Sequence, residues 1–182
     1  MVAQLLLRSG ANINAQGGQY GNALQAAATT YNGSEAVVRL LLENGADINA
    51  QGGEYGNALQ GAASNNNQAV ARLLLENRAD INAQGGFHGN ALQAAAGHYG
   101  RSEGLVRLLL ENGADINAQG GQFGNALQAA ALRGGEGICR AGDAMVRLLL
   151  KIGQLSMLKA RKIAMRCKQR PIMERRRWLD CC

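Results

Sequence analysis

The sequence has little proline, tryptophan or histidine. Its 182 residues include one proline, one tryptophan and two histidines. No uninterrupted apolar run is long enough to cross a bilayer. Met1 to Leu7 is too short for a signal peptide and lacks its basic start. We therefore expect a soluble intracellular protein, cytoplasmic or nuclear, without a membrane span.

The usual residue patterns of enzymes and metal sites are also missing. The four cysteines form no Cys-x-x-Cys pair, which argues against a structural metal site. The paired glycines, such as Gly52-Gly53, are not followed by the Lys-Ser/Thr of a phosphate loop. His88 and His98 suggest no catalytic arrangement with Ser or Cys. We expect no catalytic, cofactor-binding or metal-binding residues, and no enzyme.

What the chain has is an internal repeat. Asn-Ala-Leu-Gln begins at Asn22, Asn57, Asn90 and Asn125, at spacings of 35, 33 and 35 residues. Repeats of this length are typical of solenoids, in which each unit packs only on its neighbours. The recurring acids Asp47, Asp80 and Asp115 hold one loop position per unit, so we assign them a structural role.

One unit predicts two helices and a loop. Asn22 is a favoured N-cap, and Gln25 has the spacing of a capping box. A second, strongly apolar helix covers Val37 to Leu42, and Gly45 suits the left-handed position after it. The polar, glycine-rich stretch from Ala46 to Gly53 predicts a hairpin-like connector. Arg78 takes the place of that helix-ending glycine in the next unit, at a cost of about 1 kcal/mol if the position stays left-handed.

The segment Val38 to Ala50, Val-Arg-Leu-Leu-Leu-Glu-Asn-Gly-Ala-Asp-Ile-Asn-Ala, resembles the second helix and loop of an ankyrin repeat and recurs at Val106 to Ala118. The first helix departs from the family's usual Thr-Pro-Leu-His and has Asn-Ala-Leu-Gln. This variant resembles repeats in large arrays of filamentous-fungal proteins. The resemblance implies an all-α ankyrin-repeat solenoid that binds proteins, and a fragment of a longer array.

The repeats divide the chain into an array and a tail. We expect an array over 1–150, made of a partial repeat at 1–19, full repeats at 20–53, 54–86 and 87–121, and a last helix pair at 122–150. Leu5 to Leu7 and Leu148 to Leu150 are expected to be uncovered at the two ends. Such apolar ends predict marginal solubility and self-association.

The tail, residues 151–182, differs from the array in charge. It carries ten Lys and Arg against two acids, whereas residues 1–150 carry nine Arg and no Lys against eleven acids. Arg175 to Arg177 beside Trp178 suggest binding to nucleic acid or an acidic membrane. Cys167, Cys181 and Cys182 suggest metal or disulfides. The other interpretation is that the tail is an irregular or disordered by-product of a shifted reading frame, with no specific nucleic acid as partner.

Positions that vary between the near-identical units indicate the displayed surface. One set lies at the expected loop tips and the other at the end of each first helix. Both belong to the concave face that ankyrin-like stacks use for binding. Exposed aromatic residues are frequent anchors at protein interfaces. The candidate partner-binding residues are Tyr20, Tyr31, Tyr55, Phe87, His88, His98, Tyr99 and Phe123.

The leading function is therefore a protein-binding scaffold with an unknown protein partner. The alternatives are binding of nucleic acid or an acidic membrane through the tail, and a non-functional relic of a larger ankyrin protein. The alternative explanation of the variable residues is that they change freely between units because packing does not constrain their positions.

The frame hypothesis makes a prediction about the gene. Displaced by one base, codons for Val-Val-Arg-Leu-Leu-Leu (GTG GTT AGA TTG CTG CTN) give Trp-Leu-Asp-Cys-Cys, the sequence of 178–182. In the same way, Asn-Ala-Leu-Gln-Ala-Ala gives residues 165–170 and Ile-Asn-Ala-Gln-Gly gives 156–160. We expect the displaced frame after Leu150 to encode a fifth repeat when the nucleotide sequence is determined. A displaced frame without these motifs would refute the hypothesis.

Overall fold

The computed structural model of the chain describes residues 2–30, 35–98, 102–134 and 139–152. Most of the tail, 153–182, lies outside these residues. Within them the chain is all-α, as predicted. The helices are α1 (Val2–Arg8), α2 (Ala23–Thr29), α3 (Glu35–Glu43), α4 (Ala58–Ser64), α5 (Gln68–Glu76), α6 (Ala91–Ala96), α7 (Glu103–Glu111), α8 (Ala126–Gly134) and α9 (Cys139–Ile152). No helix in these ranges is long and apolar enough to span a membrane.

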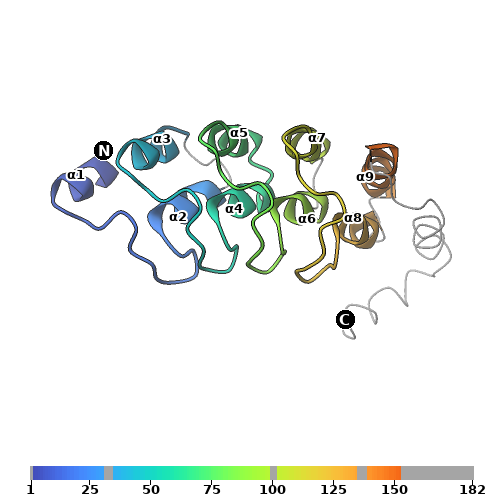
Figure 1. The fold of residues 1–182 in the computed structure, drawn as a ribbon, viewed down its shortest axis with the longest axis horizontal. Coiled ribbons are helices and arrows are strands. Elements are labelled where there is room, and N and C mark those ends of the chain that lie inside the picture. Colours follow the sequence, from blue (N-terminus) through green and yellow to red (C-terminus); the bar gives the residue numbers. More distant parts are fainter. Residues whose placement is uncertain (1, 31–34, 99–101, 135–138, 153–182) are drawn as a thin grey trace.

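The helices form two parallel rows, and the loops project from one side (Figure 1). The first helices α2, α4, α6 and α8 pack successively on one another, and each pairs with the second helix that follows it. The second helices, together with α1, form the other row. The loops 9–22, 44–57, 77–90 and 112–125 extend beyond the first helices, away from the second helices. This is the predicted order of helix, turn, helix and long loop.

The core lies between the two rows. Leu24, Leu59 and Leu92 from the first helices are fully buried, as are Val38 and Val70 from the second helices. Full burial of one such side chain contributes about 2 kcal/mol. Alanine fills the rest of the first helices, and in α4 and α6 every residue from Ala58 to Ala63 and from Ala91 to Ala96 is buried. The small side chains let neighbouring first helices approach closely.

The predicted capping box forms in three of the four units. In α2 the Asn22 side chain accepts a hydrogen bond from Gln25 N at 2.9 Å, and Gln25 Oε1 accepts one from Asn22 N at 2.6 Å. The same two bonds start α4 and α6. In α8, Gln128 N donates to Asn125 Oδ1 at 2.8 Å, but Asn125 N donates to Phe123 O instead. Half of the box is therefore missing in the fourth unit.

The two ends of the array differ. Leu6 in α1 is 56% exposed, whereas Leu41 at the equivalent place in α3 is 4% exposed. Leu5 is also exposed, as predicted. The prediction for Leu148 to Leu150 was wrong in two positions, because Leu148 and Leu149 are buried in the core and only Leu150 is half-buried. A second helix is covered by the first helix of its own unit; α8 covers α9, and no described helix covers α1 in this way.

Arg78 holds the left-handed conformation expected from its place in the repeat. Its φ is 66°, close to the 86° of Gly45 and the 92° of Gly113 at the equivalent positions. The cost of a side chain in this region is steric and local to the backbone. A Cβ added to Gly45 or Gly113 would meet no atom within 4 Å, so the cost there is conformational alone.

We predict that Arg78→Gly raises the free energy of unfolding by about 1 kcal/mol, because glycine removes the left-handed penalty. The reciprocal change, Gly113→Arg, should lower it by a similar amount. Urea unfolding followed by circular dichroism measures both, with Arg78→Lys as the control that keeps the penalty. Equal stabilities for Arg78→Gly and Arg78→Lys would contradict the explanation.

A second prediction compares two glutamines of the same motif. Gln60→Met should lower the free energy of unfolding by about 3 kcal/mol, because it leaves the buried Asn57 N–H without its partner and removes the hydrogen bonds to the carbonyls of Ala83, Gly85 and Gly89. Gln128→Met should lower it by less than about 1 kcal/mol, since Gln128 makes fewer such bonds. The same urea titrations test both variants. A similar loss for the two would show that the bonds of Gln60 are not what holds the units together.

Candidate protein-binding surface

Each loop is a hairpin closed by one isolated bridge between two glycines. The four bridges pair Gly17 with Gly21, Gly52 with Gly56, Gly85 with Gly89 and Gly120 with Gly124. In each bridge the first glycine donates its N–H to the carbonyl of the second, at 2.7–2.8 Å. The three residues between the paired glycines form the loop tip. A backbone hydrogen bond thus closes each tip.

Backbone hydrogen bonds also join successive tips. Glu54 N donates to Gln19 O at 2.8 Å, Phe87 N to Glu54 O at 2.8 Å, and Gln122 N to Phe87 O at 3.0 Å. Gln19 Nε2 adds a side-chain bond to Glu54 Oε2 at 2.7 Å. The tips are therefore held in register along the array.

Glycine is required where the tips meet. Gly53 has φ 62°, and a Cβ there would lie 2.6 Å from the backbone of Tyr20. Gly86 and Gly121 have the same conformation, and a Cβ would overlap the backbone of Tyr55 and of His88. Side chains at these positions would force the loops apart. Their absence allows the close contact that the hydrogen bonds need.

A chain of side-chain-to-backbone bonds ties the loop bases together nearer the helices. Asp47 N donates to Asn14 Oδ1, and Asp47 Oδ1 accepts from Asn49 N at 3.0 Å. Asn49 Oδ1 then accepts from Asp80 N at 2.8 Å. Asp115 repeats both contacts: its N–H donates to Asn82 Oδ1 of the preceding loop, and its Oδ1 accepts from Asn117 N of its own loop. These bonds support the structural role predicted for the recurring aspartates. Among the described residues, no three His, Cys, Asp or Glu side chains gather where they could hold a metal ion.

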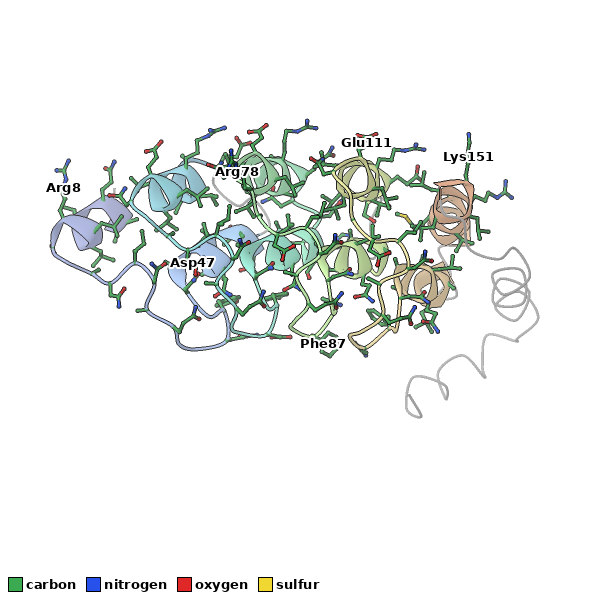
Figure 2. The ribbon with its side chains drawn as sticks, viewed as in Figure 1. Arg8, Asp47, Arg78, Phe87, Glu111 and Lys151 are labelled. Atoms are coloured by element: carbon green, nitrogen blue, oxygen red, sulfur yellow. The ribbon has the colours of Figure 1, made fainter. Side chains whose placement is uncertain are left out.

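The ordered tips carry a line of aromatic side chains, which we call the loop-tip strip. Tyr20 and Tyr55 stack with ring centres 6.5 Å apart, and His88 and Phe123 stack at 5.8 Å. Phe87 meets His88 edge-on at 5.1 Å. Figure 2 shows Phe87 at the loop end of the molecule and Glu111 and Lys151 on the opposite side. The strip consists of Gln19, Tyr20, Glu54, Tyr55, Phe87, His88, Gln122 and Phe123.

Two rings of the strip are open to solvent. Phe87 is 50% exposed and Tyr20 is 47% exposed. Tyr55, His88 and Phe123 are half-buried between their neighbours. The strip has one charged residue, Glu54. The surface that a partner protein would contact therefore consists of aromatic and amide groups and carries little charge.

Of the three predicted binding residues that follow the first helices, the structure describes only one. His98 is half-buried at the end of α6, while Tyr31 and Tyr99 lie outside the described residues. A Cβ added to Gly97 would lie 3.1 Å from the Phe123 ring, so the structure brings this helix end and the fourth tip together.

Thr29 also has a packing explanation for its variation. It is buried, and its Oγ1 donates to Ala26 O. A Cβ added to Gly61 of the next unit would lie 2.6 Å from Thr29 Cγ2. The threonine and the glycine therefore fit each other, a relation that sequence reasoning missed. The signal was present, because Gly61 replaces the alanine that the other three first helices have at this position.

Comparison with known proteins agrees with this architecture. A family model described as Ankyrin repeats (3 copies) matches residues 1–85 and 31–120. A search of curated proteins finds no match to the chain. The paired helices, the bridged loops and the extent of the model match lead to one conclusion: the chain belongs to the ankyrin repeat family.

Proposed function

We propose that the chain is a non-enzymatic scaffold that binds a protein partner through the loop-tip strip on its concave side. Ankyrin repeats are generally protein–protein interaction modules. The observation that carries the assignment to the strip is the exposure of Tyr20 and Phe87 on a backbone held by hydrogen bonds. Ordered aromatic side chains lose little conformational freedom on binding and are common anchors of protein interfaces.

The first helices offer a partner few side chains of their own. All side chains of α4 between Ala58 and Ala63 are buried, as are those of α6 between Ala91 and Ala96. Selectivity on the concave side then comes from the strip, whose residues differ from one unit to the next. The partner that fits is a protein segment with apolar and hydrogen-bonding groups rather than one rich in acidic groups.

The alternative function through the basic tail lies outside the described residues, except for Lys151 and Ile152. It stays a prediction from the sequence. A chain shortened to residue 152 distinguishes the two surfaces, since it keeps the whole strip.

The test uses the unmodified chain and three altered forms: two double variants and the chain shortened to residue 152. It compares the proteins that each form captures from an extract of the source cells. We expect Tyr20→Ala with Phe87→Ala to weaken binding of the leading partner by about tenfold or more, because each ring truncation removes about 1 kcal/mol or more. The matched control is Arg72→Ala with Arg107→Ala, two exposed residues of the second helices. Affinities are then measured with the purified partner by calorimetry. Equal loss in both double variants, or loss only on removing 153–182, would contradict the proposal.

A further inference from the structure

The α1 end of the array has an open groove along the first loop and the start of α2. An open groove of about 400 Å³ runs along Ala15 to Ala23 and Ala26. Ala23 is exposed there, although the alanines at the same position in α4, α6 and α8 are buried. Leu5 and Leu6 are exposed on α1 beside the loop. The three observations point to the position that a first helix would occupy.

Inside the array, the equivalent place is filled by a first helix and its glutamine. Gln25 Nε2 donates to Ala50 O at 3.0 Å, Gly52 O at 3.3 Å and Gly56 O at 2.7 Å. Gln60 and Gln93 make the same three contacts with the loops that follow them. In the first loop the corresponding carbonyls belong to Ala15, Gly17 and Gly21. No glutamine among the described residues reaches them.

In α8, the corresponding glutamine reaches no such carbonyl within the described ranges. Gln128 of α8 is half-buried, and its Oε1 is buried without a hydrogen-bond partner among the described residues. Its Nε2 makes none of the three carbonyl contacts that Gln25, Gln60 and Gln93 make. The donor at one end of the molecule and the acceptors at the other are the two halves of the contact that joins successive units.

We propose that copies of this chain associate end to end, with α8 of one copy seated on the first loop and α2 of the next. Gln128 of the first copy then donates to the carbonyls of Ala15, Gly17 and Gly21 of the second. The interface continues the packing already present between α2, α4, α6 and α8. It joins two different surfaces, so it leads to open chains of molecules rather than a closed dimer.

The geometry also requires α1 to move aside. α8 is paired with α9, and in a continuous stack α9 takes the place that α1 holds in the single copy. Both helices contain Leu-Leu-Leu, at 5–7 and 148–150. α1 has no buried residue, so its displacement removes little apolar burial. This association goes beyond the proposed function, because it uses the ends of the array and not the strip.

A side chain introduced at Gly18 should block the end-to-end contact without disturbing the single copy. Its φ is 66°, and a Cβ there would meet no atom within 4 Å in the single copy. At the equivalent Gly53, a Cβ would lie 2.6 Å from Gln19 O and Tyr20 C of the preceding loop. Gly18→Asn is therefore tolerated in one copy, since asparagine adopts this conformation readily, but it collides with the backbone of an incoming fourth loop.

The experiment is sedimentation velocity on the full chain over a concentration series. We expect the average mass to rise with concentration, and Gly18→Asn to weaken association by about tenfold or more. Gly45→Asn is the control, because Gly45 has φ 86° and an added Cβ there meets nothing within 4 Å. Gln128→Met should also weaken association, and Leu6→Lys should not. Circular dichroism checks that all variants are folded.

Three outcomes would overturn the proposal. One is a chain that stays monomeric at all concentrations, as expected if another segment such as 153–182 fills the groove. A second is association that Gly18→Asn and Gly45→Asn affect equally. The third is association that Leu6→Lys abolishes, because the second copy then lies on α1 instead of replacing it.

Discussion

The fold depends on a buried glutamine in each of the first three complete helix pairs. The side-chain oxygen of Gln25, Gln60 or Gln93 accepts the N–H of the asparagine that starts its own helix, and the side-chain nitrogen donates to carbonyls of the next loop. Helix capping and stacking of units are thus the same interaction. Because these groups are buried, water cannot replace the bonds, and losing one leaves several polar atoms unsatisfied. Each unit therefore fixes its successor, as expected for a solenoid.

A fixed backbone with variable side chains follows from this arrangement. Glycines at 53, 86 and 121 let each loop tip lie directly against the tip before it, and one backbone hydrogen bond joins each pair of successive tips. Side chains at the tips are free to change without altering the frame. Tyrosine, histidine and phenylalanine occupy the same tip position in different units, and they stack along the array. This separation of frame and surface is what suits the chain to recognition.

Several features followed from sequence because their cause is local. The spacing of Asn22 and Gln25 predicts a capping box that is present, and the position of Arg78 predicts a left-handed residue that is present. Features that depend on a neighbour were harder to predict. Leu148 and Leu149 looked uncovered at the end of the repeat pattern, but α8 buries them. Thr29, at the variable end of α2, packs against Gly61 in the next unit, and the sequence did not predict this contact. The candidates Tyr31 and Tyr99 lie outside the described residues.

The period, the helices and loops of each unit, and the family could be predicted from the sequence, because all three are set by residues close together in the chain. Tertiary structure decided which glutamines are satisfied and which apolar side chains are covered. Gln25 and Gln128 belong to copies of the same Asn-Ala-Leu-Gln motif, yet within the part of the chain that the structure describes only Gln25 donates to carbonyls of the loop that follows its unit. Leu6 and Leu41 hold equivalent positions in the leucine runs of α1 and α3. Among the described helices, a first helix packs over Leu41 but none packs over Leu6 in this way. The physical reason is that in a stack each unit is completed by its neighbours, so identical segments differ in energy according to what lies beside them.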